Sequence, residues 1–336
     1  MNLDLKMEGP LERLHIDVNL SDNGTLHSMA EDVYRGLTSN PKYLLPKYFY
    51  DEEGSALFEC ITEVPEYYLA RTERGLLSSI SGDLMSRVRP TELVELGSGS
   101  SIKTRLLIDA GNGGGVGTLN RYVPFDVSSE MLHASAGALL QDYSSLYVHG
   151  VVGSFEHHLE RIPSPLGRRL VVFLGSTIGN LTPPECRHLL SQVRNLLEPG
   201  DRLLLGVDLV KDVSVLEAAY NDSTGVTAEF NRNILRVLNR GLAADFRPEA
   251  FHHSAFFNVE ESRVEMHLRP ESSQTVQIED IGLTLHIGPE ETIWTESSYK
   301  FTQTSVSDML NDAGLTLERW YTDAHSLFGL ALAAPS

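Results

Sequence analysis

The sequence predicts an α/β protein built on a doubly wound, mostly parallel sheet, with a second α+β part inserted near its carboxyl-terminal end. From about residue 85, short apolar runs alternate with helical stretches, and the run at 170–174 is apolar at every position. Such a run is typical of a strand buried on both faces of a parallel sheet. With 336 residues, 41% of them hydrophobic, the chain suffices for one large domain with an insertion, or for two.

The alternation of strand and helix defines the predicted parallel sheet. The predicted strands are 92–96, 121–125, 145–152, 170–174 and 202–208. The predicted helices between them are 103–110, 128–140 and 183–197. Because a parallel strand needs a crossover connection, this order favours helices on both faces of the sheet.

The rest of the chain has a different texture. Two longer helices, at 213–220 and 225–239, precede alternating segments at 255–259, 263–268, 275–278 and 283–287, which we expect to form an inserted α+β part. A helix at 306–312 and strands at 315–321 and 327–333 then predict an antiparallel hairpin on the edge of the main sheet. The segment before about residue 75 is helical and aromatic-rich and is expected to form a lid with the insertion.

These patterns divide the chain into three parts. We predict an N-terminal lid and substrate segment at 1–80, a cofactor-binding domain at 81–210 and 301–336, and an inserted substrate-recognition domain at 211–300.

Composition excludes several functions. The formal net charge of −19 and the pI near 5.0 argue against binding a nucleic acid or an anionic membrane surface, both of which need clustered basic residues. Two cysteines, Cys60 and Cys186, fit a reducing compartment. The chain starts without an apolar signal segment and has no apolar run of about 20 residues. We therefore expect a cytoplasmic protein, and by default a monomer.

A glycine turn indicates a cofactor. Gly97 and Gly99 follow the first strand of the sheet, where open α/β sheets bind ligands. Ile102 stands where the dinucleotide fingerprint has its third glycine, and Glu95 is expected to form an acidic rim that repels phosphate. S-adenosylmethionine, a cation without phosphate, suits such a rim. Asp126, at the end of the second strand, is expected to bind ribose hydroxyls or, alternatively, to cap the next helix.

Two histidine pairs, His157–His158 and His252–His253, invite a metal-binding interpretation. Adjacent residues point in different directions on a helix or strand, so one metal cannot readily take both members of a pair. We expect no metal site.

Longer strings of sequence resemble one known family. These strings are 47–51, 65–68, 95–105, 173–183, 208–212, 219–222 and 225–233. They run collinearly from about residue 30 to the end and resemble the ergothioneine-pathway L-histidine Nα-methyltransferases. The resemblance implies a Rossmann-like class I methyltransferase sheet with a second α+β substrate-recognition domain. It also implies that S-adenosylmethionine trimethylates free L-histidine to hercynine, a step toward ergothioneine.

Carried over residue by residue, the resemblance implies that Gly97, Lys103 and Asp126 bind S-adenosylmethionine, with Lys103 reaching its methionine carboxylate. Ser154 and Phe155 stand where family members usually carry Asp-Phe for the adenine. A serine hydroxyl would accept a weaker hydrogen bond from the exocyclic amine of the adenine than a carboxylate would.

The resemblance also implies a substrate pocket. Asn180 and Tyr220 would hold the carboxylate and amine of the amino acid, while Glu296 and Ser298 would bind its imidazole, with Tyr67 completing that side. On sequence alone, a glutamate on a strand more often faces solvent. Other implied or proposed pocket residues are Met266 as an apolar wall, Tyr50 and Phe58 as aromatic contacts to a methylated cation, and Tyr50 as the candidate catalytic residue.

Other functions stay open at this stage. The same chemistry could act on another amino acid, such as tryptophan or tyrosine, although an indole offers only a hydrogen-bond donor and matches Glu296 with Ser298 poorly. A NAD-dependent oxidoreductase is disfavoured by the missing third glycine. The remaining alternative is a non-catalytic sensor of S-adenosylmethionine or an amino acid. The group that removes the amine proton is unassigned.

Overall fold

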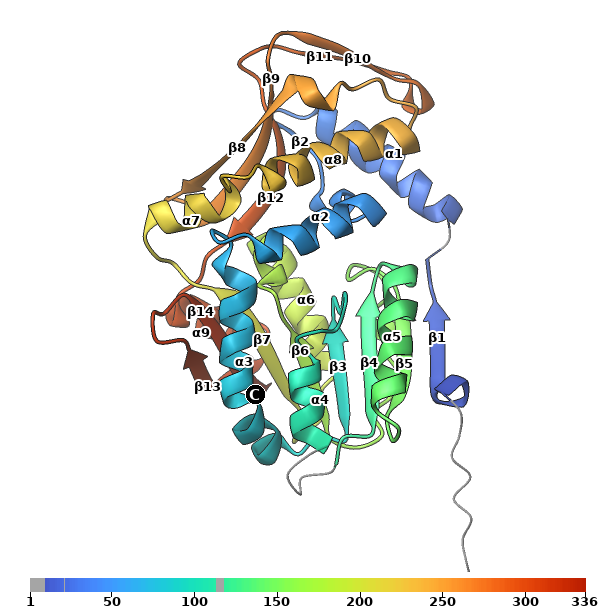
Figure 1. The fold of residues 1–336 in the computed structure, drawn as a ribbon, viewed down its shortest axis with the longest axis vertical. Helices are drawn as coiled ribbons and strands as arrows, with labels where there is room; N and C mark the ends of the chain where they lie inside the picture. Colours follow the sequence, from blue (N-terminus) through green and yellow to red (C-terminus); the bar gives the residue numbers. More distant parts are fainter. Residues whose placement is uncertain (1–9, 21, 113–117) are drawn as a thin grey trace, which may run out of the picture.

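The computed structural model describes residues 10–20, 22–112 and 118–336, and within them the protein has two lobes stacked along its longest axis (Figure 1). The larger lobe holds a sheet in the order β1-β5-β4-β3-β6-β7-β14-β13. Its strands are β1 (Leu14–Val18), β5 (Tyr147–Val152), β4 (Arg121–Asp126), β3 (Glu92–Leu96), β6 (Arg169–Phe173), β7 (Arg202–Asp208), β14 (Phe328–Pro335) and β13 (Leu315–Thr322). Neighbouring strands are parallel along the order β1-β5-β4-β3-β6-β7, whereas β14 is antiparallel to both β7 and β13. The predicted α/β sheet and its terminal hairpin are confirmed.

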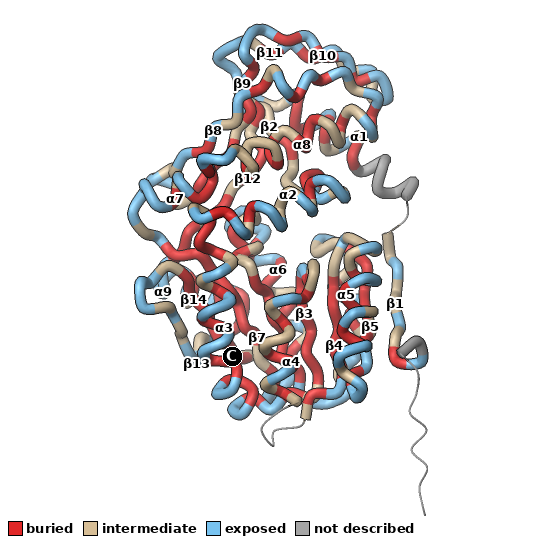
Figure 2. Tube along the Cα trace, in the orientation of Figure 1, coloured by how far each residue is buried: buried red, intermediate tan, exposed pale blue. Residues whose placement is uncertain are grey.

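Helices cover both faces of this sheet. They are α3 (Tyr68–Val88), α4 (Arg105–Asn112), α5 (Ser129–Asp142), α6 (Pro183–Asn195) and α9 (Gln303–Asp312). Successive residues of a strand point to opposite faces, so Leu93 packs in the cluster beneath α3, α4 and α5, while Val94 packs in the cluster with α6 and α9. Figure 2 shows the central strands buried along most of their length. This two-sided burial explains their continuous apolar runs.

The smaller lobe has its own sheet, in the order β2-β12-β9-β8. Its elements are α1 (Asp22–Thr38), β2 (Lys42–Tyr43), α2 (Glu52–Glu63), α7 (Val213–Tyr220), α8 (Val226–Gly241), β8 (Phe251–Asn258), β9 (Arg263–Pro270), β12 (Ile293–Tyr299) and the hairpin β10 (Gln274–Ile278) with β11 (Leu283–Ile287). One hydrophobic cluster joins the N-terminal helices to this sheet. The lobe lies over the carboxyl ends of the parallel strands (Figure 1).

The N-terminal segment is more divided than the sequence predicts. A helical segment was expected, but β1 adds a parallel strand to the main sheet beside β5. The reason is that β1 is an edge strand and only partly buried, so it carries no continuous apolar run. Arg13 anchors it by donating to the carbonyl oxygens of Leu140, Tyr143 and Leu146. The domain boundaries at 80, 210 and 300 stay a prediction.

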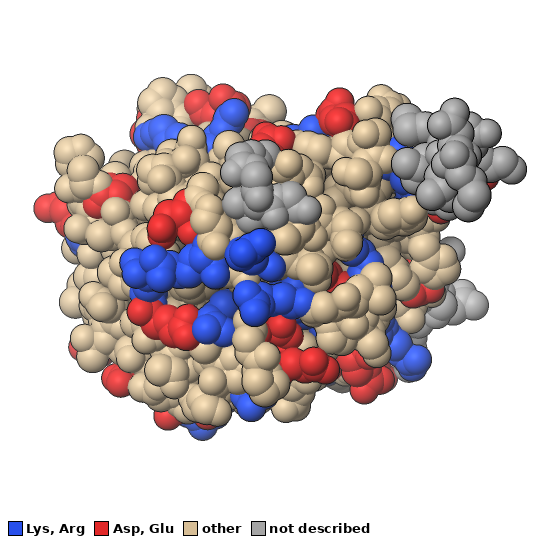
Figure 3. Space-filling view, turned by 90° about the horizontal axis from the view of Figure 1, so that it is seen from below, with Lys and Arg blue, Asp and Glu red and all other residues tan. Residues whose placement is uncertain are grey.

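The opposite end of the larger lobe carries a basic surface. Arg87, Arg168, Arg202 and Arg319 line a hollow of about 530 Å³ there, together with Glu318. Figure 3 views this end and shows Lys and Arg gathered in a band, with Asp and Glu beside it. The acidic composition predicts no surface of clustered basic residues. That expectation is wrong locally, because these arginines lie far apart in the chain and only the fold brings them together.

In the part of the chain that the structure describes, no helix combines the length and the apolar character needed to cross a membrane.

The fold predicts opposite effects for two glycine substitutions. A Cβ added at Gly54 in α2 would overlap the carbonyl oxygen of Phe49, whereas a Cβ at Gly75 in α3 would meet nothing within 4 Å. We expect Gly54→Ala to lower the free energy of unfolding by about 1–3 kcal/mol, because overpacking shifts the backbone. Gly75→Ala, the matched control, should raise it by about 0.5–1 kcal/mol. Urea unfolding measures both, and equal stability of the two variants would contradict the packing of α2.

Candidate functional site

The first loop at the carboxyl edge is shaped by glycine. After β3, Gly97 and Gly99 have φ of +67° and +47°, a left-handed conformation that costs glycine nothing. The ring of Phe155 lies beside this loop, since its Cζ would be 3.5 Å from a Cβ at Gly97. Phe155 also stacks on Phe125, with ring centroids 5.7 Å apart. The glycine turn and the predicted adenine-binding phenylalanine therefore lie side by side.

Asp126, at the end of β4, closes the same loop. Its Oδ2 accepts the N–H of Gly99 at 2.8 Å, and its Oδ1 accepts the N–H of Ser128 at 3.0 Å. Burial raises the pKa of Asp126, and these backbone hydrogen bonds oppose that rise. Ser128, not Asp126, is the N-cap of α5, because its side chain accepts from Met131 N–H. Each Asp126 oxygen keeps a lone pair, so the carboxylate suits two ribose hydroxyls.

Lys103 lies at the meeting point of two loops. Its ammonium forms an ion pair with Glu73, a fully buried glutamate of α3 that the sequence analysis missed. The other oxygen of Glu73 accepts the N–H of Gly175, just after β6, at 2.8 Å. Lys103 thus reaches across the carboxyl edge of the sheet, where the resemblance places the methionine carboxylate. No local pattern around Glu73 signals this role, because its partners lie 30 and 102 residues away.

The expected acidic rim at Glu95 is wrong. The Glu95 side chain is buried, and its two carboxylate oxygens accept hydrogen bonds from the hydroxyl groups of Thr104 and Tyr122. Burial raises its pKa to about 7. A residue of a fully buried strand points into the protein, so Glu95 supports the loop from behind instead of facing a ligand.

Ser154, predicted at the adenine position, is already engaged. Its N–H donates to His158 Nδ1 at 3.1 Å, and its hydroxyl oxygen lies 3.4 Å from the same nitrogen.

His253, from the second histidine pair, lies within hydrogen-bond distance of Asn231 Nδ2 and the Tyr220 carbonyl oxygen. One His–Asp–His set among the described residues, His15, Asp17 and His149, lies at the β1 edge, with both imidazoles bonded to Asp17.

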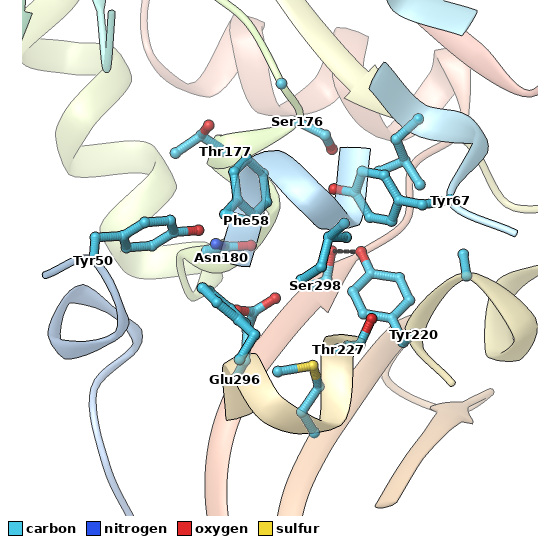
Figure 4. A pocket seen from close by; sticks show the side chains of 16 residues that line it. Tyr50, Phe58, Tyr67, Ser176, Thr177, Asn180, Tyr220, Thr227, Glu296 and Ser298 are labelled. Atoms are coloured by element: carbon cyan, nitrogen blue, oxygen red, sulfur yellow. Dashed lines mark hydrogen bonds between the residues drawn. The ribbon is translucent and has the colours of Figure 1, made fainter. Parts of the chain in front are cut away.

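A cavity of about 60 Å³ lies between the two lobes, beyond the carboxyl end of β6 (Figure 4). All eight residues predicted for substrate binding line it: Tyr50, Phe58, Tyr67, Asn180, Tyr220, Met266, Glu296 and Ser298. They come from separate parts of the chain, including the segment before α2, the turn after β6, and strands β9 and β12. The structure therefore brings together residues that only the family resemblance grouped.

The polar side of the cavity is formed by β12. Glu296 and Ser298 are two residues apart and face the same side of the strand. Tyr220 donates its hydroxyl hydrogen to Ser298 Oγ at 2.7 Å, the dashed line in Figure 4. Glu296 is 9% exposed, and among the described residues none donates a hydrogen bond to its carboxylate. Burial raises the pKa of Glu296 to about 7, while Lys300 lowers it.

Aromatic rings form the opposite side. Phe58 lies edge-on to Tyr50 with centroids 5.7 Å apart, and Phe230 lies 5.6 Å from Tyr50 and 6.0 Å from Phe58. Phe230, on α8, was not assigned a role from the sequence, although it lies within one of the matching strings. Thr227, one turn earlier, also lines the cavity, and its buried hydroxyl has no hydrogen-bond partner. Thr227 and Phe230 are three residues apart, a spacing that places both on one face of a helix and that the sequence already shows.

Comparison with known proteins gives the family. A family model described as "Histidine-specific methyltransferase, SAM-dependent" matches residues 29–335. The chain belongs to this family. It is 47% identical to histidine N-alpha-methyltransferase of Mycobacterium tuberculosis, covering 96% of this chain and 99% of that protein. It is 46% identical to the Mycolicibacterium smegmatis protein of the same name, with coverage of 94% and 97%.

A more distant relative is ergothioneine biosynthesis protein 1 of Neurospora crassa, 30% identical over 68% of this chain and 26% of that protein. Among solved structures, an S-adenosylmethionine-dependent methyltransferase from Clostridium acetobutylicum aligns at 11% identity and a TM-score of 0.46, covering 83% of this chain and 98% of that one.

As a member of the histidine-specific methyltransferases, the protein uses S-adenosylmethionine as its methyl donor. The residues at the carboxyl edge fit this cofactor. Asp126 keeps free lone pairs, Phe155 offers a ring beside the glycine turn, and Lys103 brings a cation to the same edge. Which contact each residue makes stays a prediction.

We expect Asp126→Asn in this methyltransferase to weaken S-adenosylmethionine binding about 10- to 100-fold, the range for losing a hydrogen bond to a charged group. The asparagine NH₂ would also face one of the two backbone N–H groups that now donate to Asp126. Asp142→Asn, at an exposed carboxylate paired with Arg105, is the control. Titration calorimetry measures both, and equal affinities would remove Asp126 from the cofactor site.

The raised pKa of Glu296 predicts a pH-dependent stability. The folded protein holds this proton more tightly than the unfolded chain, whose carboxyl has its ordinary pKa of 4.5, so stability falls as pH rises from about 4.5 to 7. Glu296→Gln should match the unaltered, ligand-free protein below that window and exceed its free energy of unfolding by up to about 3 kcal/mol above it. Thermal unfolding at a series of pH values, with Glu260→Gln as a surface control, tests this. A stability difference that stays constant with pH would contradict it.

Proposed function

We propose that this enzyme transfers three methyl groups to the α-amine of free L-histidine and forms hercynine, a step toward ergothioneine. The observation that carries the proposal is the unpaired, buried Glu296 carboxylate beside the Ser298 hydroxyl in one cavity. An imidazole offers one N–H donor and one acceptor nitrogen, so a carboxylate and a hydroxyl match both. The names of the mycobacterial and fungal relatives support the same substrate and pathway.

We expect Asn180 and Tyr220 to contact the main chain of the amino acid. Asn180 ends the short helix that follows β6, and Tyr220 ends α7, so both are held by regular structure. The Asn180 amide can donate to a carboxylate and accept from an amine, whereas the Tyr220 hydroxyl gives its hydrogen to Ser298 and can only accept. The free Thr227 hydroxyl adds a further polar group there. This arrangement directs the α-amine toward the carboxyl edge of the main sheet.

Alignment accounts for much of the proposed catalysis. When bound, S-adenosylmethionine supplies an electrophilic methyl group on its sulfonium. The residues of the pocket hold the amine on a line with that group, which replaces a chance encounter in solution. Only a neutral amine has the lone pair for the attack, so its proton must leave first.

The tyrosines of the cavity do not act as phenolate bases in this proposal. Burial raises the pKa of Tyr50, Tyr67 and Tyr220 well above the usual value of 10. Each hydroxyl therefore keeps its proton at neutral pH and serves to position the substrate. Tyr50, the candidate catalytic residue, is best placed to accept a hydrogen bond from the amine, and water carries the proton away.

The aromatic side suits the product. Each methylation removes an N–H donor, and the third leaves a fixed cation that can no longer donate a hydrogen bond to protein. The ring faces of Tyr50, Phe58 and Phe230 suit every stage, because a ring face attracts a cation without accepting a proton. Met266 completes the wall with an adaptable apolar side chain.

We also propose a monomer in the cytoplasm. Cys60 and Cys186 are both free thiols, which supports a reducing compartment. Light scattering of the purified protein tests the monomer.

The first test of the proposal is mass spectrometry of the purified enzyme incubated with S-adenosylmethionine and the twenty amino acids at equal concentration. We expect trimethylated histidine as the dominant product. A methylated form of another amino acid would retain the chemistry and overturn the imidazole pocket. Absence of any methylated amino acid, with S-adenosylmethionine still bound, would favour a sensor.

A further inference from the structure

A buried lysine lies directly behind the polar side of the cavity. Lys300 follows β12, and its side chain is 0% exposed. Its ammonium donates to Asp208 Oδ2 at 2.9 Å, to the Tyr220 hydroxyl oxygen at 2.8 Å and to Ser298 Oγ at 2.8 Å. All three of its hydrogens are thereby used. Two of the three acceptors line the cavity, yet Lys300 itself does not.

The direction of these hydrogen bonds follows from chemistry alone. An ammonium carries donors and no acceptor, so the oxygens of Tyr220 and Ser298 must both accept from Lys300. Ser298 Oγ accepts a second hydrogen bond from Tyr220 at 2.7 Å. A hydroxyl oxygen has two lone pairs, and both are now occupied. The remaining hydrogen of Ser298 has no partner on that side and is left for a ligand in the cavity.

Asp208 is the ion-pair partner of Lys300. This carboxylate, at the end of β7, is fully buried and also accepts the Tyr68 hydroxyl at 2.9 Å. Lys211 is a second cation on the same carboxylate, 2.5 Å from Oδ1, but it contacts Tyr68 and not the hydroxyls of the cavity. A buried ammonium is costly unless it is paired. Asp208 therefore supplies the counter-charge for Lys300, whose ammonium can donate a hydrogen bond to Ser298 but cannot accept one.

We propose that Lys300, held by Asp208, is a positioning residue that makes Ser298 a hydrogen-bond donor toward the substrate, so that the cavity selects the neutral imidazole in one orientation. The N–H of the ring then faces Glu296, and its unprotonated nitrogen faces Ser298. An imidazolium would direct a second N–H at the Ser298 hydrogen. The inference rests on the proposed function, because it concerns the histidine ring.

The test compares two lysines that share one carboxylate. In Lys300→Met we expect the KM for histidine to rise at least about 10-fold, while the affinity for S-adenosylmethionine is unchanged, because the donor hydrogen of Ser298 can turn away from the ring. Lys211→Met removes the same charge from Asp208 without touching Ser298, and its KM should stay within about 3-fold of the unaltered enzyme. Should Lys300→Met fail to fold, Lys300→Met combined with Lys211→Met and Asp208→Asn removes all three buried charges and takes its place, with Lys211→Met plus Asp208→Asn as its control.

A double-mutant cycle separates positioning from a merely structural role. If Lys300 acts through Ser298, then adding Lys300→Met to Ser298→Ala should change the KM for histidine by less than about 3-fold. Full additivity of the two losses, or an equal rise of KM in Lys300→Met and Lys211→Met, would overturn the inference. Failure of the proposed function looks different, since the unaltered enzyme would then give no methylated histidine at all.

Discussion

The arrangement of the two lobes depends on one buried carboxylate, Asp208. It ends β7 in the main sheet, and it contacts Tyr68 at the start of α3, Lys211 ahead of α7, and Lys300 at the end of β12. Its backbone N–H donates to Ser176 Oγ in the turn after β6 at 2.9 Å. A buried carboxylate needs several partners to offset its lost hydration, and here those partners come from both lobes. Because these partners pair with one carboxylate, Asp208 connects the residues around the cavity to the main sheet.

A second constraint is that the cavity is closed from water on most sides. Burial raises the pKa of Glu296 to about 7, and it raises the pKa of Tyr50, Tyr67 and Tyr220 well above the usual value of 10. In the free enzyme, the buried Glu296 carboxylate therefore lacks a hydrogen-bond donor. A substrate with an N–H at that point supplies this donor when it binds. Selectivity for a nitrogen heterocycle follows from the missing donor at Glu296 more than from the shape of the cavity.

The cofactor side is built on a different principle. Two backbone N–H groups donate to the Asp126 carboxylate and so order the loop of Gly97 and Gly99, and Glu95 supports this loop from beneath. Such a site exists before its ligand arrives, so binding does not have to order it. The Glu73–Lys103 ion pair lies where this loop meets the turn that leads to Asn180. Cofactor and substrate sites therefore share a boundary made of charged groups on rigid elements.

The sequence by itself determined the larger lobe, because strands buried on both faces need apolar residues at every position, and the runs at 92–96 and 170–174 show this within five residues. The sequence also named eight of the residues that line the cavity, four of them within the matching strings, and their individual roles stay predictions. Tertiary structure alone decided the rest. The edge strand β1, the burial of Glu95 and the partner of Glu73 depend on contacts between distant residues. So does the donor role that we propose for Ser298, because Lys300 is paired with an aspartate 92 residues earlier, which no local pattern can reveal.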